Sequence, residues 1–143
     1  MKQDFPEITS FGTLFAFAQA LEEGLIRMSE EASTKGGPKA AEAGQAHKKH
    51  AKRAKQLERL RRERLNEVVL QPLEGMNRDA YAPDLCCPED ASGSALALAK
   101  AEEKAALFYE EAAEKAKSVL GGMERTLKKL AAESRELAAS IRE

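Results

Sequence analysis

Apolar residues recur every three or four positions along four long stretches of the chain, which is the pattern of amphipathic helices. The stripe of the first stretch, which includes the polar residues Glu22 and Ser29, is Phe11, Phe15, Ala18, Glu22, Leu25, Ser29 and Ala32. The stripe of the third, which includes Glu102, is Ala95, Leu98, Glu102, Ala105, Tyr109, Ala112 and Ala116. Side chains at such spacings share one face of a helix, and an apolar face packs against other helices. The pattern therefore predicts a helical bundle.

Glycine and proline residues separate the helical stretches. Two breaks are short, Lys35–Pro38 and Gly121–Gly122, whereas segment 71–92 contains three prolines and is long enough to cross the bundle. We predict helices at 10–33, 39–70, 93–120 and 123–142, all within one domain that spans residues 1–143. Two short-linked hairpins joined by one long crossover form an all-α, ferritin-like four-helix bundle.

The composition supports this fold class. The chain has 26 alanines but only three valines and three isoleucines, and β-branched residues are the ones that sheets favour. No stretch has the length and apolarity of a membrane span or a signal peptide. The two cysteines, Cys86 and Cys87, are adjacent, so they form no disulfide framework. We therefore expect a cytoplasmic protein that does not bind membranes.

Charged residues make up 33% of the chain, yet the formal net charge is -1. This balance argues against a chain that binds polyanions over its whole surface. The charges are not balanced in residues 48–64, which contain nine basic and two acidic side chains. That stretch suits an acidic partner or nucleic-acid phosphates, or it is a solvated face that pairs with the Glu-rich later helices or a second subunit. It contains no aromatic residue, and we expect no binding to nucleic acid.

Two glutamates stand in the middle of the apolar stripes, Glu22 in the first helix and Glu102 in the third. A gapless alignment of residues 22–32 with 102–112 gives five identities in eleven positions and puts these glutamates at equivalent sites. A buried carboxylate costs several kcal/mol unless it is paired, protonated or bound to a metal. A slight rotation of the first helix would instead leave Glu22 at the edge of the core. The core positions in that alternative are Leu14, Leu21 and Met28.

The two histidines of the chain, His47 and His50, lie three residues apart on the stripe of the second helix. Side chains at this spacing share a face, so both imidazoles could reach one centre. The fourth helix has a similar polar pair, Glu133 and Glu136, beside its apolar stripe. Both spacings are also common on solvated helix surfaces, so their position in the bundle decides what they mean.

Three stretches resemble the rubrerythrin-like branch of the ferritin-like superfamily. Residues 101–112 are similar to the family's glutamate followed seven residues later by a tyrosine, here Glu102 and Tyr109. A weaker copy surrounds Glu22, and the run from His50 to Pro72 is similar to the family's long second helix and its exit. Together these stretches cover most of the chain.

The resemblance implies that each hairpin supplies one glutamate from its first helix and a Glu-x-x-His pair from its second, which together hold two metal ions. The candidate metal ligands are then Glu22, His47, His50, Glu102, Glu133 and Glu136. His47 replaces an expected bridging glutamate, and Glu136 replaces an expected histidine. An imidazole cannot bridge two ions without losing its second proton, so a lopsided dinuclear site, a mononuclear site and a remnant that binds nothing all remain open.

Carboxylate and imidazole ligands suit iron and manganese, and zinc could occupy the histidine-rich side. The resemblance implies non-haem iron chemistry with dioxygen or peroxide, with Tyr109 as a hydrogen-bond donor near the metal. Such an oxidoreductase or peroxidase would have no rubredoxin domain of its own, because Cys86 and Cys87 cannot supply four thiolates, and it would need an external electron donor. The alternative is a non-catalytic helical-bundle interaction module with a degenerate metal site.

The predicted second helix has about thirty residues, or roughly 45 Å, and would extend beyond its neighbours. Its end, residues 65–70, is strongly apolar. An apolar end that overhangs the bundle predicts a homodimer through this helix and the 71–92 connection. If the connection folds back over the apolar end, nothing is left to drive the dimer.

Overall fold

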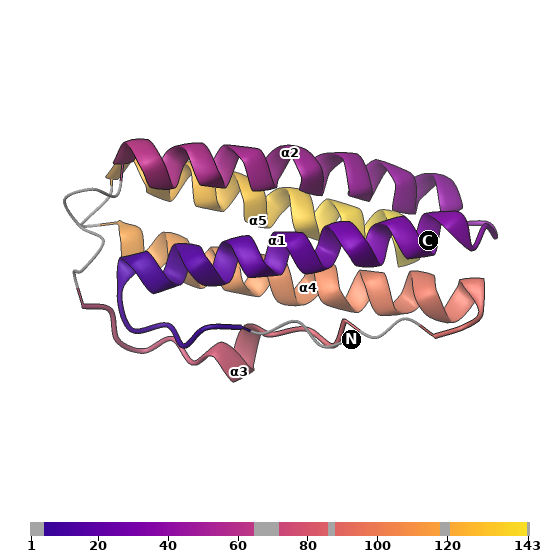
Figure 1. The fold of residues 1–143 in the computed structure, drawn as a ribbon, viewed down its shortest axis with the longest axis horizontal. Coiled ribbons are helices and arrows are strands. Elements are labelled where there is room, and N and C mark those ends of the chain that lie inside the picture. Colours follow the sequence, from indigo (N-terminus) through magenta and orange to yellow (C-terminus); the bar gives the residue numbers. More distant parts are fainter. Residues whose placement is uncertain (1–4, 65–71, 86–87, 118–120, 143) are drawn as a thin grey trace.

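The computed structural model describes residues 5–64, 72–85, 88–117 and 121–142. Within these residues the chain is all helical, as predicted. The elements are α1 (Phe11–Thr34), α2 (Ala40–Arg64), the one-turn α3 (Arg78–Tyr81), α4 (Ala91–Ala116) and α5 (Gly121–Arg142). The four long helices form a bundle (Figure 1). None of the described helices combines the length and the hydropathy that a membrane span requires.

The ends of the helices follow from local chemistry. Ser10 begins α1 as its N-cap, and its hydroxyl accepts a hydrogen bond from the Thr13 amide at 3.2 Å while the Thr13 hydroxyl accepts one from the Ser10 amide at 2.9 Å. Between α1 and α2 the chain turns at Gly36 and Gly37, whose φ angles of 76° and 84° are conformations that glycine adopts at little cost. The predicted short break at this point is confirmed.

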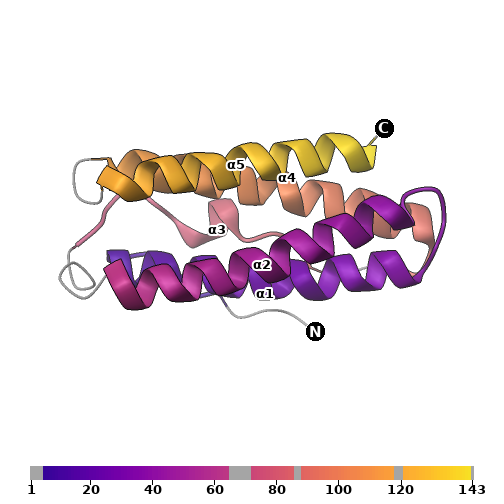
Figure 2. The same ribbon diagram turned by 90° about the horizontal axis from the view of Figure 1, so that it is seen from above.

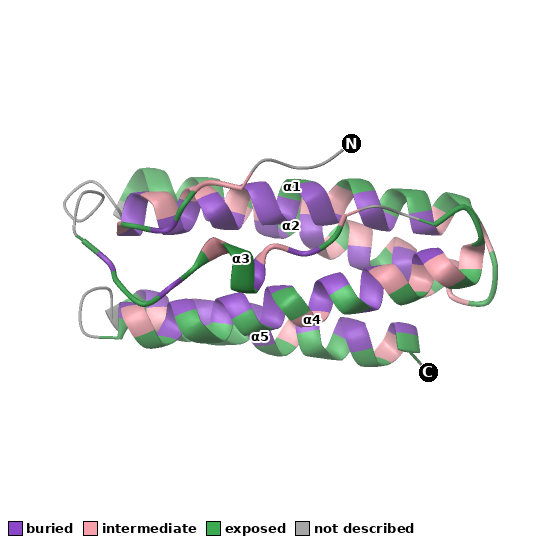
Figure 3. Ribbon diagram, turned by 90° about the horizontal axis from the view of Figure 1, so that it is seen from below, coloured by how far each residue is buried: buried purple, intermediate pink, exposed green. Residues whose placement is uncertain are grey.

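The long helices pair as two antiparallel hairpins, α1 with α2 and α4 with α5 (Figures 1 and 2). In the bundle α1 also packs against α4, and α5 lies beside α2. The helices α2 and α4 run in the same direction, so the connection between them has to return along the length of the bundle. This connection and α3 lie over the side formed by α1 and α4 (Figure 3).

The connection contains more regular structure than its three prolines indicate. It contains α3, which begins where the Asn77 side chain accepts a hydrogen bond from the Asp79 amide at 3.0 Å. Around α3 the side chains of Leu73, Met76 and Tyr81 are buried in the core. The apolar run 65–70 and the two cysteines, by contrast, lie outside the described residues, as does the predicted end of the second helix.

Aromatic side chains fill one part of the core. Phe17 of α1 and Phe108 of α4 have ring centroids 4.7 Å apart, and Phe5 and Tyr81 pack on this pair at 4.9 Å from Phe17 and 5.8 Å from Phe108. Tyr109 meets Phe108 edge to face at 5.1 Å. The Tyr109 hydroxyl points away from this apolar group and into a second part of the core, which is polar.

Candidate functional site

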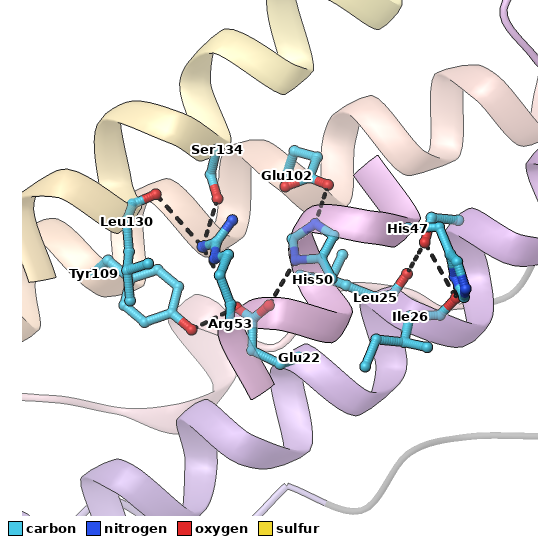
Figure 4. Close-up of polar contacts among 11 residues, drawn as sticks. Glu22, Leu25, Ile26, His47, His50, Arg53, Glu102, Tyr109, Leu130 and Ser134 are labelled. Atoms are coloured by element: carbon cyan, nitrogen blue, oxygen red, sulfur yellow. Dashed lines mark hydrogen bonds and ion pairs between the residues drawn. The ribbon is translucent and has the colours of Figure 1, made fainter. Parts of the chain in front are cut away.

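A cluster of polar side chains occupies the centre of the bundle (Figure 4). Its members are Glu22 from α1, His50 and Arg53 from α2, Glu102 and Tyr109 from α4, and Ser134 from α5. All six are buried, and Glu22, His50 and Glu102 have no exposed surface at all. The prediction that both glutamates face the core is therefore confirmed. The alternative core positions on α1 are buried as well, because the buried face of this helix is wide enough to hold both sets.

His50 lies between the two glutamates. Its Nδ1 is 2.6 Å from Oε1 of Glu22, and its Nε2 contacts Oε2 of Glu102. Carboxylate oxygens accept hydrogen bonds, so both contacts are satisfied only when both ring nitrogens carry protons. Burial alone would lower the pKa of His50, but the charges of Glu102 and Glu22 outweigh burial and raise this pKa to about 9. His50 is therefore an imidazolium at neutral pH.

Glu22 receives contacts on both of its oxygens. Besides the His50 contact on Oε1, the Tyr109 hydroxyl donates a hydrogen bond to Oε2 at 2.5 Å, and Nη2 of Arg53 lies 3.4 Å from the same oxygen. Burial would raise the pKa of Glu22, but the two cations outweigh it and hold the pKa below its ordinary value. Burial and the Glu22 charge raise the pKa of Tyr109 well above its ordinary value, so this residue stays a neutral donor.

Arg53 brings a second cation to the centre. Its Nη2 donates to the Ser134 hydroxyl at 3.0 Å and approaches the Leu130 carbonyl at 3.4 Å, and its guanidinium carbon lies 5.2 Å from the centroid of the Tyr109 ring. Burial would lower the pKa of Arg53, but Glu22 and other charges raise it, so the guanidinium stays ionised. Two side-chain nitrogens, Nε and Nη1, are buried and have no hydrogen-bond partner among the described residues.

Arg53 is not among the residues predicted for the site. The signal was nevertheless available, because Arg53 follows His50 by three residues and so lies close to the same face of α2. The many basic residues around it predict a solvated surface or a face for an acidic partner. A long cationic side chain in a core is rare unless it is paired, and only the facing carboxylate of Glu22 makes this position favourable.

His47 does not join the cluster. It is only half-buried, and its Nδ1 lies 3.1 Å from the backbone carbonyl of Ile26 (Figure 4). Residues three apart differ by about 60° around a helix axis, and this rotation turns His47 towards the α1 backbone while His50 faces the centre. The structure therefore does not bring the two imidazoles to one point.

Glu133 and Glu136 also lie outside the cluster. Helix α5 turns other side chains to the core, namely Met123, Leu127, Leu130, Ala131, Ser134, Leu137, Ala138 and Ile141. Glu133 stands at the edge of this stripe and is half-buried, and Glu136 is exposed. The small Ser134, rather than either glutamate, faces Arg53.

The centre of the bundle brings together only part of the predicted set of metal ligands. Three of the six candidate ligands come together, Glu22, His50 and Glu102, and each ring nitrogen of His50 already faces a carboxylate oxygen. In the described part of the chain no group of three His, Cys, Asp or Glu side chains is arranged to hold a metal ion. The guanidinium of Arg53 places positive charge beside Glu22. The two glutamates at the centre thus face two cationic side chains, His50 and Arg53.

A scan of family models, a search of curated proteins and a search of solved structures find no match to this chain. Its function has to be inferred from the chemistry of its own residues. The central chemistry is a hydrogen-bonded path from Tyr109 through Glu22 and His50 to Glu102, with Arg53 beside it.

Proposed function

We propose that this chain is a ferritin-like bundle, similar to the rubrerythrins, in which a buried salt-bridge network replaces the dinuclear metal centre and which acts as a non-catalytic interaction module. Two antiparallel hairpins joined by a crossover along the bundle support the ferritin-like arrangement. The observation that carries the loss of metal chemistry is Arg53, whose Nη2 lies 3.4 Å from Glu22 in the buried centre.

A guanidinium and a metal ion meet the same electrostatic need in different ways. Both place positive charge beside a buried carboxylate, which would otherwise be costly. A metal ion can also offer an open coordination position or change its oxidation state, whereas a guanidinium does neither. A centre balanced by Arg53 and by the His50 imidazolium is therefore suited to holding the helices together rather than to turning over a substrate.

The test is metal loading of the intact protein. After anaerobic incubation with Fe(II), Mn(II) or Zn(II) and desalting, we expect a clearly substoichiometric content of each metal and no change in the thermal unfolding midpoint. The variant Arg53→Gln, which lacks the guanidinium, is loaded with the same metals, and Glu103→Gln is loaded as the surface control. One tightly held equivalent of any of these metals in the unmodified protein would overturn the proposal.

A second candidate is a single metal ion held by Glu22, His50 and Glu102. The observation that favours it is Oε1 of Glu102, which is buried and has no partner among the described residues. An unsatisfied buried carboxylate oxygen is costly, and a divalent cation would satisfy it. Two carboxylates and an imidazole suit iron, manganese or zinc. When bound, iron would supply redox chemistry with dioxygen or peroxide, using electrons from an external donor.

The same loading experiment separates the two candidates when Glu102→Gln is added. A single-metal site predicts about one equivalent in the unmodified protein and a loss of most of it in Glu102→Gln. Uptake that survives this substitution unchanged would come from somewhere other than the centre and would contradict the single-metal candidate.

A further inference from the structure

A basic groove lies between α2 and α5. It has a volume of about 460 Å³ and is lined on its outer part by cationic side chains, with Glu133 the only acidic residue among those that line it. The cations are Lys49, Lys52, Lys55, Arg59 and Lys129. Helices α2 and α5 are both in front in Figure 2, so the groove belongs to the side of the bundle opposite the crossover.

The spacing of residues on α2 explains why these charges gather. Lys49, Lys52 and Arg59 follow one another at steps of three and seven, so they lie along one face of the helix. Lys129 stands across the groove on α5. Positive side chains held this close repel one another, and a structure that retains them favours the approach of an anion.

The groove cations differ from several surface arginines, which have a carboxylate partner. Elsewhere Arg135 forms two hydrogen bonds with Glu110, at 2.8 and 2.5 Å, and Arg142 forms two with Glu103, at 2.8 and 2.9 Å. None of the five groove cations forms an ion pair with any residue that the structure describes. The chain thus pairs its surface charges at several places and leaves this group open.

Arg53 provides a second and independent observation. It lines the same groove, yet its side chain is only 3% exposed. Its Nη2 is occupied by Ser134, but Nε and Nη1 have no partner in the described part of the chain. Buried N–H donors without acceptors are costly, and a guanidinium binds phosphate oxygens in strong charge-assisted hydrogen bonds. A guanidinium with two unpartnered nitrogens therefore lies beneath a groove whose rim is cationic.

We propose that the α2–α5 groove is a binding site for a small molecule that carries several phosphate groups, with Lys52 and Lys129 at the rim and Arg53 at the floor. Six cations face one carboxylate here, which suits a chain of phosphates better than a single one. The volume lies in the range of small-molecule sites. The lining contains no aromatic side chain on which a base could stack, so the phosphate groups are the part that is recognised.

The proposal does not depend on whether the centre of the bundle holds a metal. It does connect the groove to that centre, because Arg53 takes part in both. Nη2 of Arg53 is 3.4 Å from Glu22, and its buried Nε and Nη1, which have no partner in the described part of the chain, would reach an anion after a small movement of the side chain towards the groove. A bound phosphate chain would share the guanidinium with Glu22.

The test measures binding of inorganic tripolyphosphate and of ATP to the full chain by calorimetry at physiological salt. We expect one molecule of each to bind and to raise the thermal unfolding midpoint. The double variant Lys52→Glu with Lys129→Glu should weaken binding by about tenfold or more, because it reverses two rim charges. The matched control, Lys48→Glu with Lys100→Glu, makes the same change in net charge at exposed positions outside the groove lining and should retain binding within about threefold.

The two ligands identify the source of the phosphates. Equal affinity assigns the site to the phosphate chain alone, and tighter ATP binding that the rim variant abolishes assigns it to a nucleotide. The proposal is overturned if neither ligand binds at millimolar concentration, or if the control variant loses as much affinity as the rim variant. Duplex DNA that binds more tightly than both ligands would also overturn it in favour of a nucleic-acid surface.

Discussion

Helices α1 and α2 belong to the same hairpin but meet the core in different ways. The buried face of α1 carries large apolar side chains, among them Phe15, Phe17 and Leu21. The buried apolar residues of α2, in the part that the structure describes, are Ala43, Ala46 and Leu57, and between them lie His50 and Arg53. Apolar burial thus holds α1 in place, whereas α2 depends on charge pairing in the centre. In one bundle, apolar packing can therefore stabilise the position of one helix while charge pairing stabilises that of its neighbour.

The largest expected effect is on the apolar side of this comparison. Phe17→Ala removes a ring that packs between Phe5 and Phe108, and filling of such a core site is worth about 3–5 kcal/mol of unfolding free energy. Urea denaturation measures the change. Leu107→Ala, at an exposed position of α4, is the control and should cost less than about 1 kcal/mol. Equal losses in the two variants would mean that the aromatic group does not hold α1.

The pH dependence of stability tests the charged side. The pKa of His50 rises from 6.5 in the unfolded chain to about 9 in the fold, so its protonation stabilises the fold fully below pH 6.5, and this contribution is lost as the pH rises through 9. The shift corresponds to a loss on the order of 3 kcal/mol. Urea denaturation from pH 6 to pH 10 measures it. His50→Gln should flatten this window, whereas His47→Gln should leave it in place, and a profile that is already flat in the unmodified protein would contradict the imidazolium.

A smaller effect is expected for the second carboxylate that faces α2. Glu102→Gln removes the charge from the His50 contact but keeps an oxygen that can accept its hydrogen bond, so we expect a loss of about 1.5–3 kcal/mol. Glu103→Gln is the neighbouring control, since its exposed pair with Arg142 should contribute less than about 1 kcal/mol. Denaturation at pH 7 measures both. If Glu102→Gln proves more stable than the unmodified protein, the central network is not balanced as described.

The smallest effect is expected for the surface contact between α1 and α2. Nη1 of Arg61 donates a hydrogen bond to the side chain of Gln19 at 3.2 Å in an exposed position. Arg61→Ala should change the unfolding free energy by less than about 0.5 kcal/mol, because exposed polar contacts exchange readily with water. A loss as large as that of Glu102→Gln would show that α2 is held from its surface instead of from the centre.

The helical stripes and the burial of Glu22 and Glu102 were predictable from the sequence. Periodicity determines which side of a helix is apolar, and both glutamates lie in the middle of their stripes. The stripe on α5 was less informative, because one residue turns a helix by about 100°. The prediction put Glu133 beside the apolar face, where the structure also places it, half-buried, but Ser134 on the face itself was not predicted.

The rest of the site depended on tertiary contacts that periodicity does not contain. The short helix α3 is too brief for a repeating pattern, and it is fixed by the Asn77 cap and by Tyr81 packing on Phe108. Arg53 belongs to a stretch so basic that each of its charges looked solvated. Only the position of Glu22 on another helix makes one of these cations a core residue.

The central network has a consequence for how the two hairpins align. Glu22, His50 and Arg53 belong to the first hairpin, and Glu102, Tyr109 and Ser134 belong to the second. The contacts His50–Glu102, Tyr109–Glu22 and Arg53–Ser134 therefore all join one hairpin to the other. A slip of one turn between the hairpins would separate Phe17 from Phe108, and it would also leave Glu102, Tyr109 and Ser134 buried without their polar partners. The network thus adds a polar constraint on the register of the two hairpins to the one that the aromatic group supplies.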